Sequence, residues 1–151
     1  MSERLERFVA LSALLTGFNQ VQLWGSGIAG EHLQVLDEIL SADVVDDLIE
    51  VFQRLPAEDG RENAVAAIIL GDPRLGPVAR NLIILWYSGV WTQLPPAWRE
   101  AFGASPLDTT RVTSGAAYQS GLQWAVAGAH PPGAKHQGFG SWALEPKRRR
   151  A

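Results

Sequence analysis

The segment NLIILWYSGVW at residues 81–91 restricts the fold of this chain more than any other stretch. Its uninterrupted apolar part covers only residues 82–87, whereas a helix that crosses a bilayer needs about 20 apolar residues. On a helical wheel, residues 82–87 together with Val90 and Trp91 occupy most of the circumference. A helix that is apolar on every side must be enclosed. The sequence therefore predicts a helix that is covered by the chain's own core alone, or by the core and a partner together.

The rest of the chain has helical rather than alternating spacing of apolar residues, so we expect an all-α fold. A compact bundle of about five to seven helices fits the length of 151 residues. The spacing, with flanking Ser, Gly and Pro residues, predicts a first helix capped by Ser2 and ended by Gly17. It predicts further helices over 29–40, over 43–55, over 60–70, from 76–77 through the apolar segment, over 95–102 and over 114–127.

The last part of the chain is predicted to differ from the helical domain at residues 1–127. Residues 128–151 contain Pro131, Pro132 and Gly133, have no periodicity, and end in the basic run at 147–150. We expect an extended Pro/Gly-rich tail that binds a partner, because a segment without regular structure gains order only by packing on something else.

Charge is distributed unevenly along the chain, whose formal net charge is −3. Residues 31–62 carry ten acidic side chains against two arginines, whereas residues 64–98 carry one acid and two arginines. The overall balance gives no electrostatic reason to expect nucleic-acid binding. One part of the chain is suited to contact with water, and the next part is not.

One motif resembles a cofactor site. Residues 25–30, GSGIAG, satisfy the G-x-G-x-x-G pattern, which binds a dinucleotide when a strand enters it and a helix leaves it. Residues 21–24 could form a short strand, but the second strand with a ribose-binding acid is missing, since residues 43–55 have helical spacing. A glycine-rich turn between helices is the favoured interpretation, and a dinucleotide-binding enzyme is an alternative.

No other group of residues has the spacing of an active site. Cysteine is absent, no serine stands in a G-x-S-x-G elbow, and His32, His130 and His136 show no metal-ligand spacing. We therefore expect no catalytic, cofactor-binding or metal-binding residues in this chain.

The aromatic residues point to association with another protein. Interfaces favour Trp, Tyr and Arg over Lys, and this chain has six tryptophans and eleven arginines against two lysines. Leaving the apolar helix partly exposed to water would promote aggregation. The predicted contact set comprises Trp86, Tyr87, Trp91, Trp98, His136, Phe139 and Trp142.

Four blocks of the sequence together resemble the small, or gamma, subunits of FAD-dependent sugar and polyol dehydrogenases, including those of sorbitol, fructose and glucose dehydrogenases. The blocks are FVALSALLTGF at 8–18, LGPVARNLIILWYSGVW at 75–91, AYQSGLQWAV at 117–126 and HPPGAKHQGFGSWALEP at 130–146. They span nearly the whole chain.

The resemblance implies a non-catalytic subunit that binds a large flavoprotein of the glucose–methanol–choline (GMC) oxidoreductase type and supports its folding and stability. The large subunit would hold FAD and oxidise a sugar, glycoside or polyol. Many relatives carry a twin-arginine leader for export to the periplasm, and this sequence shows none. We expect a cytoplasmic complex if Met1 is the native start, and a periplasmic one if such a leader was removed. A free-standing helical scaffold or membrane-surface protein is a further alternative, although we expect no direct membrane insertion.

Overall fold

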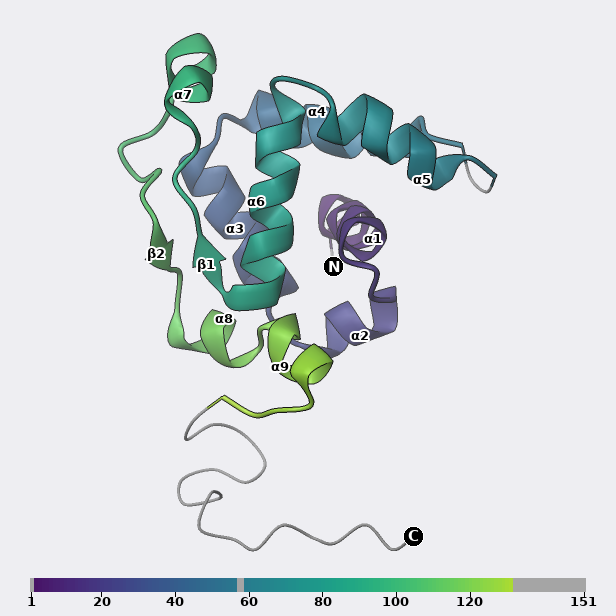
Figure 1. The fold of residues 1–151 in the computed structure, drawn as a ribbon, viewed down its shortest axis with the longest axis vertical. Helices are drawn as coiled ribbons and strands as arrows, with labels where there is room; N and C mark the ends of the chain where they lie inside the picture. The colour runs from purple at the N-terminus through teal and green to yellow at the C-terminus, as the bar shows by residue number, and fades with distance from the viewer. Residues whose placement is uncertain (1, 57–58, 132–151) are drawn as a thin grey trace, which may run out of the picture.

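A computed structural model describes residues 2–56 and 59–131 of the chain. These residues are mainly helical, which confirms the all-α class. Helix α6 (Leu75–Ser88) lies at the centre, and the other elements surround it (Figure 1). The other long helices are α1 (Glu3–Thr16), α3 (Ala29–Ile39) and α4 (Ala42–Gln53).

Short elements complete the described part of the chain. The short helices are α2 (Gln20–Gly25), α5 (Arg61–Ala64), the π-helix η1 (Val65–Leu70), α7 (Pro96–Phe102), α8 (Gly115–Gln119) and α9 (Leu122–Ala127). Two strands of two residues each, β1 (Val90–Trp91) and β2 (Arg111–Val112), pair antiparallel with Val90 opposite Val112.

The predicted ends of the first helix are confirmed. The Ser2 side chain accepts a hydrogen bond from the backbone N–H of Leu5, and so caps one of the free donors of the first turn. Gly17 ends α1 in the left-handed conformation, with φ of 80°. The helices predicted over 29–40 and 43–55 correspond to α3 and α4.

The structure corrects the interpretation of residues 21–24 as a possible strand, because these residues lie in α2. A capping box explains this helix. The Asn19 side chain accepts from the backbone N–H of Gln22, and the Gln22 side chain accepts from that of Asn19. The glycine-rich segment therefore joins helix α2 to helix α3, as the favoured interpretation predicts.

The apolar helix is shorter than its sequence pattern predicts. It ends at Ser88, because Gly89 takes a left-handed conformation with φ of 74° and turns the chain away from the helix axis. Val90 and Trp91, which the helical wheel includes in the helix, form strand β1 instead. No alternation of apolar and polar residues predicts this sheet, since two-residue strands are too short to show one.

The helix predicted over 114–127 is divided into α8 and α9. The division falls at Ser120 and Gly121. A Cβ atom on Gly121 would lie 2.6 Å from the carbonyl oxygen of Tyr87, so this position packs directly on the end of α6. The segment turns there and places both short helices against α6.

The chain itself covers most of the apolar helix. Elements α1, α4, η1, α8 and α9 all contact α6, and Leu82, Leu85 and Trp86 have no exposed surface. Ile84 is the large apolar side chain of α6 that remains exposed. The prediction of an enclosed helix is therefore confirmed, and its enclosure comes largely from the chain's own core.

The end of α6 gives a first testable prediction. A Cβ atom on Gly89 would lie 2.6 Å from the backbone of Ala117 and of Tyr118, in addition to the cost of a left-handed conformation. We expect Gly89→Ala to lower the free energy of unfolding by at least about 3 kcal/mol. Urea denaturation measures this change.

Gly17→Ala is the matched control, because Gly17 also ends a long helix with positive φ but has no atom of the described residues within 4 Å of its Cβ position. It should cost only about 1–2 kcal/mol. Equal losses in the two variants would show that the contact with α8 contributes nothing to stability.

Candidate partner-binding surface

Trp86 of α6 is a core residue in this structure. Its side chain is 0% exposed, its indole stacks on Phe8 of α1 with ring centroids 6.4 Å apart, and the ring of His32 meets it edge-on at 4.6 Å. These contacts hold α1, α3 and α6 together. In this conformation Trp86 has no atom that a partner could contact.

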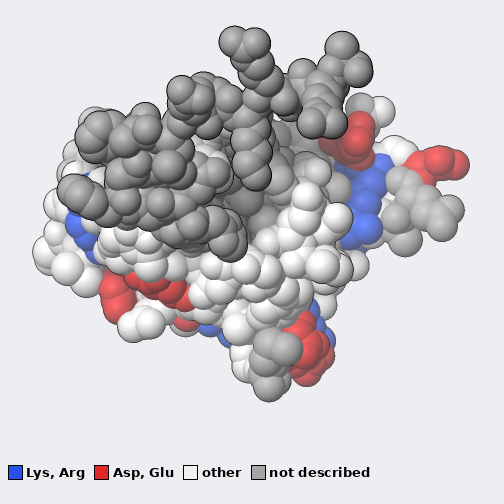
Figure 2. Space-filling view, turned by 90° about the horizontal axis from the view of Figure 1, so that it is seen from below, with Lys and Arg blue, Asp and Glu red and all other residues white. Residues whose placement is uncertain are grey.

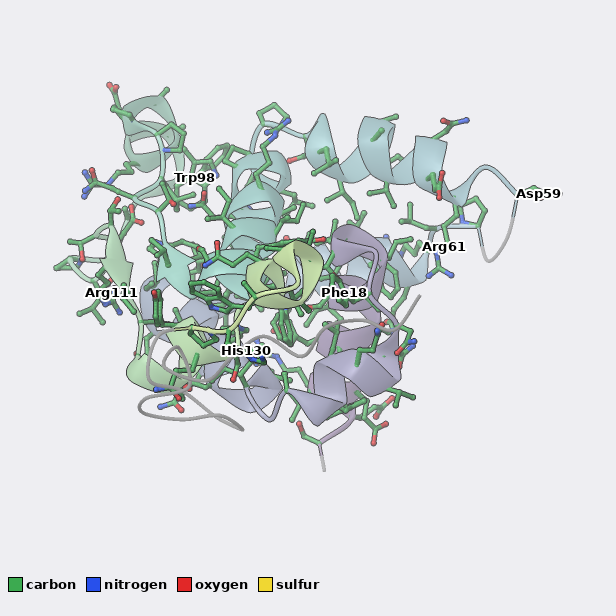
Figure 3. The ribbon with its side chains drawn as sticks, turned by 60° about the horizontal axis from the view of Figure 1, so that its bottom comes forward. Phe18, Asp59, Arg61, Trp98, Arg111 and His130 are labelled. Atoms are coloured by element: carbon green, nitrogen blue, oxygen red, sulfur yellow. The ribbon has the colours of Figure 1, made fainter. Side chains whose placement is uncertain are left out.

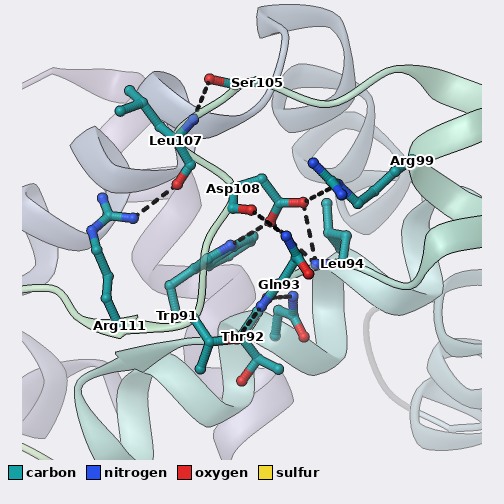
Figure 4. A network of polar contacts seen from close by, with 11 residues as sticks. Trp91, Thr92, Gln93, Leu94, Arg99, Ser105, Leu107, Asp108 and Arg111 are labelled. Carbon is teal, nitrogen blue, oxygen red and sulfur yellow. Dashed lines mark hydrogen bonds and ion pairs between the residues drawn. The ribbon is translucent and has the colours of Figure 1, made fainter.

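Trp91 is equally buried, and a carboxylate fixes its position. The indole N–H donates to the Oδ1 atom of Asp108 at 2.8 Å, and the backbone N–H of Leu94 donates to the same carboxylate at 3.1 Å (Figure 4). The guanidinium of Arg99 completes the network through an ion pair of 3.1 Å. These contacts fix the conformation of the loop between β1 and β2. Trp91 has no exposed surface.

Trp98 lies between the core and the surface. It is 4% exposed, and its indole N–H donates to the carbonyl oxygen of Arg74 at 2.7 Å. It lines a groove of about 360 Å³ between α7 and the turn from α3 to α4, beside the half-exposed ring of Phe102. Trp98 therefore offers at most an edge to a partner.

Tyr87 is the described member of the predicted contact set that is only partly buried. Its hydroxyl donates to the carbonyl oxygen of Thr16 at 2.8 Å, and its ring meets that of Phe18 edge-on with centroids 6.0 Å apart. These contacts tie the C-terminal end of α6 to that of α1.

A third segment reaches the same place. The backbone of Tyr87 touches Gly121 between α8 and α9, and Gly89 touches Ala117 of α8. We call this meeting point of α1, α6 and α8–α9 the Tyr87 junction. The remaining predicted contacts, His136, Phe139 and Trp142, lie outside the described residues.

The two described segments around the Tyr87 junction carry no charged side chain. Residues 17–30 and 115–130 contain no Asp, Glu, Lys or Arg, and they form α2, the start of α3, α8 and α9 at one end of the molecule (Figure 1). We call these two segments the uncharged end. Figure 2 views the molecule from this side, where white atoms predominate among the described residues and charged atoms lie toward the rim.

Apolar and neutral polar side chains occupy the uncharged end. Val21 of α2 is 79% exposed and Val126 of α9 is 66% exposed, more than the other large apolar side chains of the described residues. Phe18 and His130, labelled in Figure 3, lie on the end that comes forward in that view. The exposed neutral polar residues are Asn19, Gln20, Gln22 and Gln119.

The side of the molecule formed by α1 and α4 has the opposite character. A groove of about 500 Å³ there is lined by acidic and basic residues that pair with one another. Arg4 bonds both Asp37, at 2.7 Å, and Asp46, at 2.8 Å, and Arg7 pairs with Glu3. Water solvates these exposed pairs, so this side is suited to face solvent.

The uncharged end has a signal in the sequence, namely two long stretches without charged residues. The predicted contact set rests on aromatic residues instead. Residues 8–30 and 112–134 are long stretches without a formal charge, separated by about 80 positions. Only the fold shows that parts of both stretches reach the surface at the same end.

The G-x-G-x-x-G segment lacks the context of a dinucleotide site, because helix α2 and not a strand precedes it. Within residues 2–56 and 59–131, no group of three or more His, Asp or Glu side chains is arranged to hold a metal ion. No helix of this described part is long and apolar enough to cross a bilayer. Comparisons with protein-family models, curated proteins and solved structures found no match.

The Asp108 network gives a second prediction. Asparagine keeps the shape of Asp108 but turns an amide N–H₂ toward donors that need an acceptor. We expect Asp108→Asn to lower the free energy of unfolding by about 2–4 kcal/mol, since a buried charge-assisted network loses its centre. Asp47→Asn, which removes the charge from a partly exposed ion pair with Arg74, should cost at most about 1 kcal/mol in the same urea titration.

A third prediction concerns pH. Burial lowers the pKa of His32 from its ordinary value of 6.5 to about 4, and its Nδ1 atom has no hydrogen-bond partner among the described residues. Above pH 6.5 the ring is neutral in both the folded and the unfolded chain. Between pH 6.5 and 4 only the unfolded chain binds the proton, so we expect the free energy of unfolding to fall by about 3 kcal/mol over this range.

The variant His32→Phe isolates this effect, because an aromatic ring of similar size remains beside Trp86 but cannot titrate. Its free energy of unfolding, measured by urea titration from pH 7 to pH 4, should fall less steeply than that of the natural chain. His130→Phe, at an exposed position, controls for the loss of a histidine. Parallel pH profiles for all three proteins would contradict the assignment to His32.

Proposed function

We propose that this chain is the non-catalytic small subunit of an FAD-dependent dehydrogenase. It binds and stabilises a large GMC-type oxidoreductase subunit that oxidises a sugar, glycoside or polyol. The FAD and the reacting groups belong to that large subunit. The role of this chain is to cover apolar surface of the large subunit and to support its folding.

One observation carries the proposal: three of the four blocks that resemble small subunits meet at one place, and the fourth, at 130–146, lies almost entirely outside the described residues. The block at 8–18 supplies Phe18 and the carbonyl of Thr16, the block at 75–91 supplies Tyr87, and the block at 117–126 supplies Gly121. Their meeting point, the Tyr87 junction, lies beneath the uncharged end. The resemblance and the least charged surface thus converge on one part of the molecule, which supports a role in binding another protein.

The chemistry of this surface also favours an accessory role. Buried interface cores are depleted in charged residues, and exposed apolar side chains on a subunit are covered when it assembles. Obligate interfaces of this kind commonly bury more than about 2,000 Å². The side chains of Val21 and Val126 are exposed in the single chain, which supports its role as a subunit that binds a partner.

A tagged copy purified from its native cells tests the proposal and is the fourth prediction. We expect a large polypeptide to co-purify in stoichiometric amount, to show flavin absorbance, and to be identified by mass spectrometry as a GMC-type oxidoreductase. Dye reduction by the purified complex with sugars and polyols then gives the substrate class.

Co-expression supplies the control. The large subunit should be recovered in soluble, flavin-loaded form when this chain is present, and mainly in the insoluble fraction when it is absent. Recovery of the tagged chain alone, with the flavoprotein soluble and active without it, would overturn the proposed function.

A further inference from the structure

We infer that the uncharged end is the docking surface, and that its occupant is a protein whose contacting surface is itself uncharged and apolar. The assignment of the large flavoprotein as this occupant rests on the proposed function. The location of the surface and the chemistry of its occupant rest on the structure.

The lack of charged residues at the uncharged end determines which kind of occupant fits it. A charged group buried against residues 17–30 and 115–130 would lose its water and find no counter-charge there. Nucleic acids and anionic membrane surfaces bind through lysine and arginine, which these segments lack. A neutral protein surface satisfies the exposed amides of Asn19, Gln22 and Gln119 and covers the apolar side chains.

The exposed valines are the apolar contacts of this surface. Val21 and Val126 come from helices 105 positions apart in the sequence, yet both helices lie at the same end of α6 (Figure 1). Nothing in the described fold requires an apolar side chain at either position, since each is exposed. An occupant that covers these two side chains gains apolar burial at the uncharged end.

The glycines give an independent observation. Most described glycines are required by the fold: they have positive φ, or a Cβ atom would lie under 3 Å from backbone, as at Gly76 and Gly121. Gly25, Gly30 and Gly115 have neither property, because their φ is ordinary and no atom of residues 2–56 and 59–131 lies within 4 Å of the Cβ position. All three belong to the uncharged end.

Glycine in these helical positions weakens the free chain, since alanine is the better helix former. A glycine that the chain's own packing does not need is explained when the backbone of another molecule approaches it closely. The structure therefore assigns Gly25, Gly30 and Gly115 to close contact with the occupant, beside Val21 and Val126.

The test uses the complex of the tagged chain with its large subunit and is the fifth prediction. Val21→Glu and Val126→Glu should each weaken the complex at least about tenfold, because each places an unpaired charge in the interface. Ile68→Glu is the matched control, since Ile68 is 49% exposed on η1, near the opposite end of α6. It should leave the affinity unchanged.

The variants Gly25→Ala and Gly30→Ala separate docking from folding. Each should raise the Tm of the free chain by about 1–4 °C and yet weaken the complex about three- to tenfold. A purely structural role would change stability and binding in the same direction. Affinity unchanged in all four variants, within a complex that still forms, would overturn the docking surface but leave the proposed function standing.

Two other occupants are outcomes that would also overturn the inference. A second copy of this chain would appear as a dimer in size-exclusion chromatography that Val126→Glu dissociates. A lipid surface would appear as flotation of the natural chain with anionic phosphatidylserine–phosphatidylcholine vesicles, lost in the same variant. If no flavoprotein is found, the proposed function fails separately, and the same variants can be assayed against whichever identified protein binds with one-to-one stoichiometry.

Discussion

The close backbone contact at the C-terminal end of α6 is the constraint on which the rest of this structure depends. Gly89 lies against Ala117, and Gly121 lies against the carbonyl of Tyr87, with no room for a Cβ atom at either glycine. These contacts allow α8 and α9 to close the end of α6. Without them the apolar helix would remain uncovered at the place where the Tyr87 hydroxyl bonds Thr16.

Local signals predicted most of the helices correctly, because caps and glycines act within one or two turns. Ser2 and Gly17 delimit α1 as expected. The helical wheel failed at Val90 and Trp91, since a periodicity cannot show that a left-handed glycine has ended the helix before them. The pairing of β1 with β2 was equally unpredictable, because it is a tertiary contact about 20 residues away.

The sequence did not single out the uncharged end, and the reason is physical. Large aromatic side chains favour both interfaces and cores, and sequence alone does not say which. Trp86 and Trp91 lie in the core. Trp86 stacks on Phe8, and Trp91 donates a hydrogen bond to Asp108. Tyr87 marks the region near the surface because its hydroxyl needs a polar partner at the end of two helices. A lack of charge at exposed positions indicates the uncharged end, but only the fold shows which positions are exposed.

Charged residues are divided unequally between two parts of the surface, the α1–α4 side and the uncharged end. Arg4 neutralises Asp37 and Asp46 within the chain, so the α1–α4 side needs only water around it. The uncharged end has no such internal compensation, and its valines gain nothing from water. Under the proposed function, a subunit with this division would keep its solvated side outward and present one end for burial. Under the same proposal, the acidic balance of residues 31–62 would keep the free chain in solution before assembly, while the uncharged end docks.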